Sequence, residues 1–361
     1  MKWDDDLLLL NAPPERVQAQ LAAYALYLSR GSTITAKAIK VDTIKAYVFA
    51  VASFLALFSG RDCRYDSPSD RTFGTLLSPV YKDLERFETV PDRREPYTPE
   101  MHQEAERIAA PYRQQDHRTL LPALADGFAM GLMAGFRLAE WAQHSGFHNP
   151  LQPMLNHLEP PNVTTRALCP FDVRVETVAH QRLSSMDILT VPVTSIRKVW
   201  IKFRTQKNGY HGEERIFTRN PALGHCFVAA IYRSLTRFKA LQSVLPTLTE
   251  TSPLAIYWDV DSRSVRSITA PDIESFMRSL AVVVYDLHPH KDKKALQKWS
   301  AHSLRVGACV LLHAMSFSTL DIQWLLRWRS NAFMAYLRNL AGLADRQVAA
   351  LDRAQGMPHL F

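Results

Sequence analysis

Residues 301–339 read AHSLRVGACVLLHAMSFSTLDIQWLLRWRSNAFMAYLRN and concentrate reactive side chains. His302 and Arg305 are three residues apart, so they share one face if the segment is helical. After what reads as two helical turns and a loop come the indole of Trp328 and, eight positions later, the phenol of Tyr336. A guanidinium offers a planar fork of donors to phosphate oxygens, and a tyrosine hydroxyl beside such charge can become a nucleophile. This set suits attack on a phosphodiester without a metal ion.

The same segment resembles the C-terminal box of the tyrosine recombinases (phage integrase family), in which His-x-x-Arg precedes a His or Trp and then the nucleophilic Tyr. The sequence HSLRVGA followed by RWRSNAFMAYLR resembles the recombinases of eukaryotic mobile elements more than the bacterial resolving enzymes. The resemblance implies catalytic roles for His302, Arg305, Trp328 and Tyr336, with Tyr336 as the nucleophile.

Two upstream segments resemble other parts of the family pattern, in the family's order. Residues 133–143, MAGFRLAEWAQ, resemble its first box, Gly-x-Arg-x-x-Glu, which implies a catalytic Arg137 supported by Glu140. Residues 199–217, VWIKFRTQKNGYHGEERIF, alternate apolar and polar residues on both sides of an Asn-Gly turn signal, a pattern that predicts a β-hairpin. The family carries its catalytic lysine on this hairpin, which makes Lys207 the match and Lys202 a second choice.

The order of elements predicts an α+β fold that is mostly helical. Helical periodicity covers residues 15–30, a second helix begins near Asp42 and is stopped by Gly60, and residues 117–145 also read as helical, with Gly135 as a possible turn before Arg137. Residues 163–218 are rich in strand signals, and helices follow. The resemblance implies an N-terminal helical core-binding domain, 1–95, and a C-terminal tyrosine-recombinase catalytic domain with a small antiparallel sheet, 96–361.

The segment 90–101, VPDRREPYTPEM, predicts the linker between these domains. It holds three prolines and two charged pairs, and Thr98-Pro99 has the form of a helix N-cap and first helical residue. A chain of 361 residues, 47% of them hydrophobic, can bury two cores of ordinary size.

The net charge of +8 favours a polyanionic partner, although such a balance alone is common in other proteins. Residues 1–95 hold 13 Lys+Arg and 13 Asp+Glu, so residues 96–361 carry the whole excess. Together with the resemblance this predicts double-stranded DNA as the partner, bound by a homo-tetramer on two DNA sites, with no cofactor and no metal. The candidate DNA contacts are Lys40, Lys45, Arg204, Lys294 and Lys298.

Cysteine usage and the N-terminus indicate a soluble protein inside the cell. The four cysteines are far apart, without the spacing of a zinc site, and the acidic start MKWDDDLLLL is wrong for a secretory signal. The apolar stretch from Ala46 to Phe58 is too short to span a bilayer. We therefore expect no membrane partner and a DNA-associated location, in the nucleus of a eukaryotic host or the nucleoid of a bacterial one.

Each signal has a simpler interpretation. Arg137 with Glu140 can be an ordinary i,i+3 ion pair, Trp328 and Tyr336 can be core residues, and the basic run 290–298 can be a solvated face. The segment after Tyr336 suits docking on a neighbouring copy or folding back on its own domain. What favours the functional interpretation is that all these residues occur together in the family's order.

Three classes of function remain open. The first is a site-specific DNA recombinase that cleaves and rejoins strands through a 3′-phosphotyrosyl intermediate. The second is a relative that relaxes DNA or closes its ends, like a type IB topoisomerase. The third is a DNA-binding protein derived from a recombinase that no longer cleaves.

Overall fold

The structure is a computed structural model that describes residues 12–30, 39–67, 70–87, 94–142, 167–204, 212–220, 226–328 and 331–337. The chain divides into two compact units, Met1–Pro91 and Asp92–Phe361. The roles assigned above to residues 1–95 and 96–361 stay predictions.

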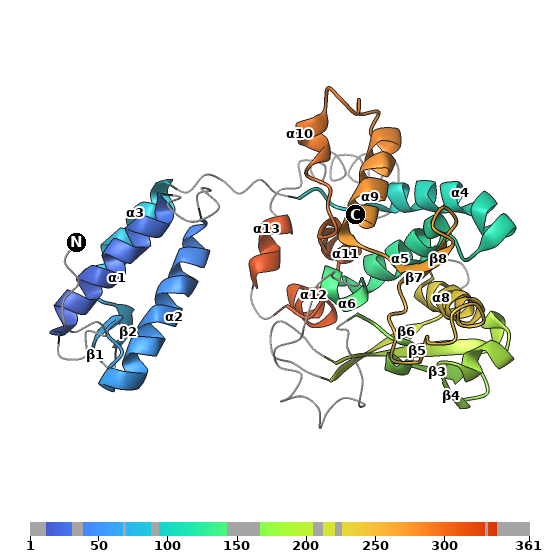
Figure 1. The fold of residues 1–361 in the computed structure, drawn as a ribbon, viewed down its shortest axis with the longest axis horizontal. Coiled ribbons are helices and arrows are strands. Elements are labelled where there is room, and N and C mark those ends of the chain that lie inside the picture. The colour runs from blue at the N-terminus through green and yellow to red at the C-terminus, as the bar shows by residue number, and fades with distance from the viewer. Residues whose placement is uncertain are drawn as a thin grey trace, which may run out of the picture. The chain divides into compact units, whose positions relative to one another are not determined.

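The first unit packs three helices and a two-stranded antiparallel ribbon (Figure 1). Its core joins Leu21, Ala25, Ile44, Val48 and Leu77. The two predicted helices are confirmed, and Gly60 ends the second of them in the left-handed conformation, with φ 68°. In chain order the elements are α1 Pro14–Ser29, α2 Val41–Ser59, β1 Tyr65–Ser67, β2 Asp70–Phe73 and α3 Leu77–Phe87.

Helix α2 is longer than the apolar stretch 46–58 of the sequence. It has 19 residues, an 18-residue window with a mean hydropathy of 1.7, and several exposed apolar side chains, including Phe54 and Leu57. Length and composition alone would let it cross a bilayer, which by itself is weak evidence, because core helices of soluble proteins pass the same test.

The second unit is mostly helical and contains a small antiparallel sheet, so the predicted α+β fold is confirmed. In Figure 1 helix α8 lies between the sheet and helices α4, α5 and α9. The helices are α4 Pro99–Asp116, α5 Leu120–Ala134, α6 Leu138–Trp141, α8 Phe227–Gln242, α9 Ala270–Val284, α10 Lys293–Leu296, α11 Ser303–Ala314, α12 Thr319–Leu325 and α13 Met334–Leu337. Short 3-10 turns occupy Pro170–Asp172, Asp187–Thr190, Val193–Ser195 and Asn331–Phe333.

Four strands form the main sheet in the order β4-β3-β5-β6, and β7 pairs with β8 in a separate ribbon. Strands β5 and β6 pair antiparallel from Lys198 with Thr218 to Phe203 with Glu213, which confirms the predicted hairpin. Val199, Ile201 and Phe203 alternate into the core, as the period of two requires. The strands are β3 Val173–Thr177, β4 Arg182–Ser184, β5 Ile196–Phe203, β6 Glu213–Thr218, β7 Ile256–Asp259 and β8 Ser264–Ser267.

The start of α4 is fixed as the sequence predicted. Thr98 is the N-cap, and its hydroxyl accepts a hydrogen bond from the Met101 amide at 3.4 Å. Just before it, the Tyr97 amide donates to the Ser303 carbonyl at 3.0 Å. Gly307 permits this close approach, because a Cβ there would lie 2.1 Å from the Tyr97 carbonyl oxygen. The linker end is thus attached to α11, which carries Arg305.

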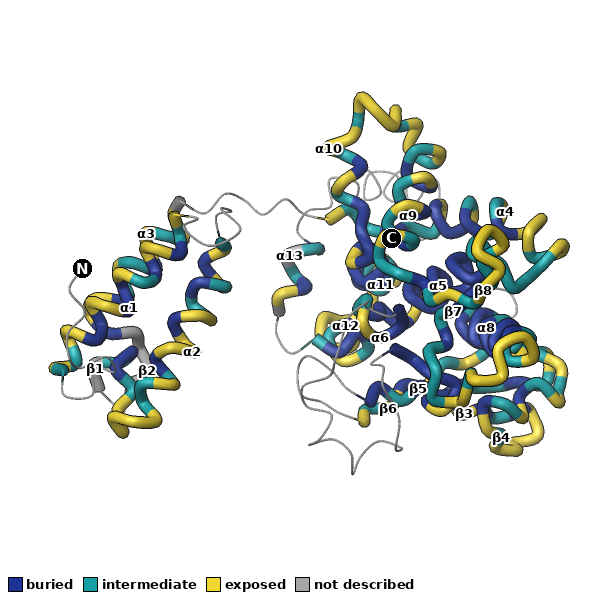
Figure 2. The backbone as a smooth tube through the Cα atoms, in the orientation of Figure 1, coloured by how far each residue is buried: buried dark blue, intermediate teal, exposed yellow. Residues whose placement is uncertain are grey.

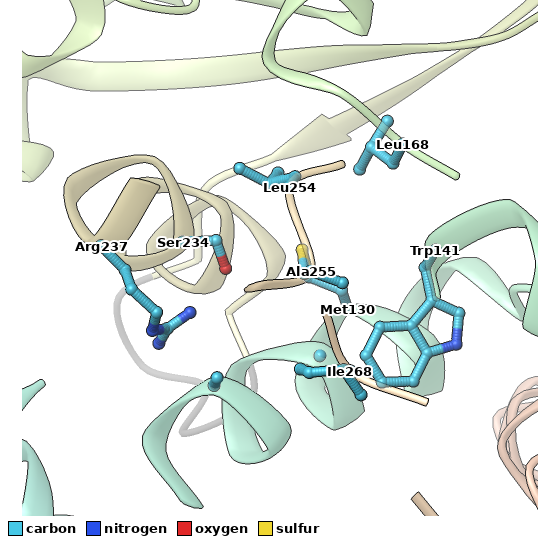
Figure 3. A pocket seen from close by; sticks show the side chains of 10 residues that line it. Met130, Trp141, Leu168, Ser234, Arg237, Leu254, Ala255 and Ile268 are labelled. Atoms are coloured by element: carbon cyan, nitrogen blue, oxygen red, sulfur yellow. The ribbon is translucent and has the colours of Figure 1, made fainter. Parts of the chain in front are cut away.

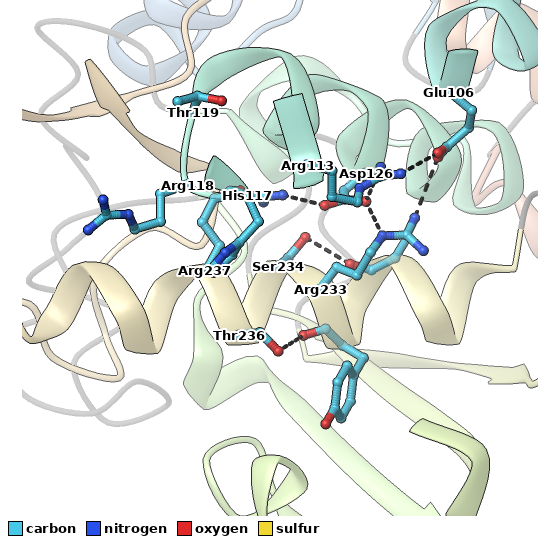
Figure 4. Close-up of polar contacts among 12 residues, drawn as sticks. Glu106, Arg113, His117, Arg118, Thr119, Asp126, Arg233, Ser234, Thr236 and Arg237 are labelled. Carbon is cyan, nitrogen blue, oxygen red and sulfur yellow. Dashed lines mark hydrogen bonds and ion pairs between the residues drawn. The ribbon is translucent and has the colours of Figure 1, made fainter. Parts of the chain in front are cut away.

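Buried ion pairs connect α4, α5 and α8 around Asp126, whose side chain is fully buried (Figure 4). Its carboxylate accepts from Arg113 at 3.2 Å and from Arg233 and Arg237 of α8. Arg113 and Arg233 also pair with Glu106. We call these five residues the Asp126 cluster. In Figure 2 much of α5 and α8 is coloured as buried.

A cavity between α5 and α8 is lined by Trp141, Met130 and Arg237 (Figure 3). Its volume is about 10 Å³. That is room for about one water molecule, so the cavity is a packing defect and not a ligand site.

Candidate active site

A tight turn after α5 brings Arg137 to the site. Gly135 ends α5 with φ 56°, and a Cβ there would lie 2.7 Å from Leu326 Cδ2, so both the conformation and the close approach require glycine. Arg137 is then the N-cap of α6, and its amide donates to Glu140 Oε2 at 2.9 Å. The predicted helix 117–145 is therefore interrupted at residues 135–137, as the possible turn at Gly135 anticipated.

Arg137 and Arg305, 168 positions apart in the sequence, converge on one carbonyl oxygen. The Arg327 carbonyl lies 3.2 Å from Arg137 Nη2 and 3.5 Å from Arg305 Nη2. Arg305 also donates to the carbonyls of Gly135, at 2.5 Å, and Leu326. These bonds hold both guanidiniums where one small anion could contact the two.

Tyr336 and His302 form the second half of the site. Tyr336 Oη lies 2.9 Å from His302 Nε2, within hydrogen-bonding distance. Helix α13 holds the tyrosine there because Phe333 and Leu337, on either side of it, are buried against α11 and α12. His302 is the N-cap of α11 and Arg305 lies in its first turn, so the helix carries both groups to the same place.

The ring of Trp328 connects the two halves. Its ring centroid is 5.9 Å from that of Tyr336, and the Arg305 guanidinium carbon lies 4.4 Å from the indole. The Trp328 Nε1 atom is buried and has no hydrogen-bond partner among the described residues. A hydrogen bond from this buried N–H to an arriving acceptor would lower the free energy of the complex.

The surroundings shift the pKa of the reacting groups. Although His302 is exposed as a residue, partial burial of its ring and the nearby guanidiniums of Arg305, Arg94 and Arg137 lower its pKa to about 4. Burial and the neighbouring arginines lower the pKa of Arg305 to about 9. Burial raises the pKa of Tyr336, and Arg305 partly offsets this. Near neutral pH the tyrosine is therefore a protonated phenol beside a neutral imidazole that can accept its proton.

Arg327 is a residue of the site that the sequence reasoning missed. Its side chain is fully buried, and its Nη2 donates to Glu140 Oε2 at 2.7 Å, while Arg137 Nη1 donates to Glu140 Oε1, also at 2.7 Å. Burial alone would raise the pKa of Glu140, but Arg327 and Arg137 hold it below its usual value. Glu140 is thus an ionised bridge that orients two arginines. The sequence feature that could have indicated Arg327 is its position in the RWR triplet around Trp328.

Of the two candidates for the catalytic lysine, the structure describes only Lys202. Lys207 falls in residues 205–211, outside the described residues. Lys202 lies on β5 opposite Glu214 of β6.

Arg204 was expected to contact DNA, but the structure places its side chain in the interior. Its side chain is buried, pairs with Asp172 at 2.8 Å and donates to the Ala167 carbonyl at 2.9 Å. A guanidinium held in this way cannot reach a partner at the surface.

The other candidate DNA contacts are surface side chains. Lys40 and Lys294 are exposed. Lys45 is paired with Glu85, and Lys298 lies 3.7 Å from Glu95. Their contact with DNA stays a prediction.

Taken together, the described residues place two convergent guanidiniums, a neutral imidazole, an unpaired indole N–H and a phenol in one site. This arrangement can bind a phosphate group and deliver a tyrosine oxygen to it.

Neither a protein-family model nor a curated protein sequence matches the chain. Among solved structures, it is similar to the integrase of transposon Tn1549 in complex with circular intermediate DNA, with a TM-score of 0.37 and 14% identity over 88% of this chain and 80% of that one. A variant of that integrase with transposon right end DNA gives a TM-score of 0.40 and 12% identity over 93% and 84%. At these values the similarity carries no argument about chemistry, which rests on the chain's own residues.

Proposed function

We propose that this protein is a tyrosine recombinase that cleaves and rejoins DNA through a covalent 3′-phosphotyrosyl intermediate. The observation that carries the proposal is the convergence of Arg137 and Arg305 beside the Tyr336–His302 pair. A phosphodiester in the transition state of in-line attack gathers negative charge on its non-bridging oxygens, and fixed guanidiniums stabilise that charge.

In the proposed first step, Tyr336 Oη attacks the phosphorus atom and the bond from phosphorus to the 5′ oxygen breaks. The phenol proton passes to His302 Nε2, whose ring is neutral near pH 7 because burial and the nearby arginines lower its pKa. The departing 5′ oxygen takes a proton, for which Lys207 is our candidate donor. Trp328 Nε1 donates to a non-bridging oxygen.

The second step reverses the first with a different strand. A 5′ hydroxyl attacks the phosphotyrosyl bond, and Tyr336 recovers its proton from His302. The energy of the original linkage is conserved in the intermediate, so rejoining requires no energy source. We propose that four copies on two DNA sites exchange strands in this way, as recombinases of mobile elements do, inside the cell and on its DNA.

The test uses nicked duplexes from the DNA that flanks the protein's own gene. When the nick releases a short leaving fragment, religation fails and the protein stays joined to DNA through a bond that survives detergent. We expect this adduct with the wild-type protein and none with Tyr336→Phe. Tyr112→Phe, which alters an exposed tyrosine on α4, serves as the matched control and should retain the adduct.

Mass spectrometry of the trapped peptide then identifies the attacking residue. An adduct on another tyrosine would contradict the role of Tyr336. Sequence-specific binding of DNA without any adduct would mean that the chain is a binding protein. Relaxation of supercoiled plasmid without sequence preference would instead indicate a topoisomerase-like activity.

A further inference from the structure

An open groove adjoins the candidate active site. It has a volume of about 420 Å³, within the range of roughly 300–1,000 Å³ that is usual for ligand pockets. It is lined by Glu213 and Arg215 of β6, by Leu320, Gln323 and Trp324 of α12, and by Arg327 and Trp328, which also belong to the site. Because Arg327 and Trp328 line the groove and also belong to the site, a group bound in the groove would lie next to an anion bound by the arginines of the site.

The main surface of the groove is a tryptophan ring. Trp324 is 63% exposed, and Leu320 beside it is 74% exposed. The buried guanidinium of Arg215 lies 4.3 Å from the Trp324 ring and donates to the Trp324 carbonyl at 2.8 Å. The indole is therefore held in place by an arginine while much of it still faces solvent.

Charge distinguishes the groove from the site. Arg215 is paired with Glu213, and Arg327 with Glu140, so the arginines lining the groove are compensated. In the site itself, Arg305 has no carboxylate partner among the described residues. The groove therefore suits a neutral aromatic group, whereas the site suits an anion.

The edges of the groove also offer hydrogen bonds. Gln323 contributes an amide and Glu213 a carboxylate, the groups that read the edges of adenine and cytosine. Arg215 Nε and Trp328 Nε1 are buried donors without a hydrogen-bond partner among the described residues. A flat neutral ring with a polar edge, covalently attached to a phosphate, fits both halves of this surface. A nucleobase has this chemistry.

We infer that the groove receives one unstacked nucleobase of the DNA strand next to the reacting phosphate, with Trp324 as its stacking platform. The inference rests on the proposed function for the location of that phosphate. It adds a positioning and specificity element: an extruded base, held by stacking and read at its edge, fixes where the phosphate lies between Arg137 and Arg305.

The first experiment requires no cleavage, so its outcome is independent of the proposed chemistry. Tyr336→Phe protein is bound to duplexes that carry 5-iododeoxyuridine at successive positions and is irradiated. We expect cross-linking at one position, on the peptide that contains Trp324. Cross-linking at no position, or only to peptides outside the groove, would overturn the inference and leave the Tyr336 adduct test unaffected.

The second experiment measures the rate of adduct formation with Trp324→Ala and Trp324→Phe. Loss of a base–aromatic stack should slow Trp324→Ala about tenfold or more, whereas Trp324→Phe, which keeps a ring, should stay within about threefold of wild type. Val260→Ala is the matched control, because Val260 is also 63% exposed but lies at the end of β7. Thermal unfolding of each variant shows whether it is folded.

The decisive comparison uses substrates that lack one base. An abasic nucleotide at the cross-linked position should remove the difference between wild type and Trp324→Ala, since neither can then stack a base. Equal slowing of the variant on intact and abasic DNA at every position would overturn the inference. A variant with unchanged rates but weaker self-association would assign the groove to a second copy of the chain instead.

Discussion

The second unit gathers arginines in two places, and the two differ in how their positive charge is compensated. In the Asp126 cluster each of three guanidiniums contacts the buried carboxylate of Asp126, and Glu106 pairs with Arg113 and Arg233 as well. Two carboxylates thus serve three arginines (Figure 4). Asp126 is buried where α4, α5 and α8 pack together, so this cluster connects the three helices.

The candidate active site has a larger excess of positive charge. Arg137 and Arg327 share a single carboxylate, Glu140, and the Arg305 guanidinium is bonded only to carbonyl oxygens among the described residues. The lowered pKa of Arg305, about 9, reflects its burial and the two neighbouring arginines. Burying a charge without a counter-ion costs free energy, and binding an anion beside it would offset that cost.

The comparison teaches that a cluster of arginines is not by itself a functional signal. What distinguishes a site from a structural network is charge left without a counter-ion, beside a group that can react. In Figure 4 the serine beside the Asp126 cluster, Ser234, donates its hydroxyl to the Ala230 carbonyl, whereas Tyr336 lies within the influence of Arg305.

The largest expected effect is on stability and belongs to the Asp126 cluster. Asp126→Asn keeps the shape but removes the buried charge that Arg113, Arg233 and Arg237 share, so we expect the free energy of unfolding to fall by about 3–5 kcal/mol. Urea denaturation measures this. Asp116→Asn, which affects a more exposed pair with Arg118, should cost about 1 kcal/mol or less. Equal losses in the two variants would contradict the structural role.

The next effect is on catalysis and belongs to the site. Arg305→Lys keeps the charge but loses the planar fork, so adduct formation should slow by about 10²–10³-fold, or roughly 3–4 kcal/mol of barrier. Single-turnover trapping on nicked DNA measures this rate. Arg118→Lys, which alters a partly exposed arginine paired with Asp116, should leave the rate unchanged.

A second readout of the same substitution needs no DNA. Inorganic phosphate should raise the unfolding temperature of the wild-type protein and of Asp126→Asn, because both retain the uncompensated arginines. Sodium chloride at equal ionic strength is the control. If Arg305→Lys were stabilised by phosphate as strongly as wild type, Arg305 would not be the anion-binding group.

Much of the fold could be predicted because local rules decide it. Gly60 at the end of α2 and Thr98 at the start of α4 act through backbone geometry that is visible in sequence. The alternation from Val199 to Phe203 likewise follows from the two-residue period of a strand. For the site, family order predicted which distant residues should meet, and Arg137, His302, Arg305, Trp328 and Tyr336 do lie together.

What could not be predicted depends on which way a charged side chain points in the folded chain. Arg204 was expected to contact DNA, yet it pairs in the interior with Asp172, 32 positions earlier. Arg327 lies beside the recognised Trp328 but turns inward with φ 58°, a backbone conformation without a local sequence signal. Asp126 gave no hint of its three partners, two of which lie more than 100 positions away.

The smallest effect concerns pH and tests the electrostatics of the excess charge directly. If burial and the arginines Arg305, Arg94 and Arg137 hold the pKa of His302 near 4, this histidine stays neutral between about pH 5 and pH 7, and adduct formation at low DNA concentration should show no loss near pH 6.5. The acid limb should appear near pH 4 instead. Because the folded pKa lies below the unfolded value, His302 lowers the stability of the fold as pH falls from about 6.5 towards 4. NMR titration of labelled histidines, with His302→Gln to assign the signal, measures the pKa itself. A midpoint near 6.5 would contradict both the burial of the His302 ring and the influence of the three arginines on it.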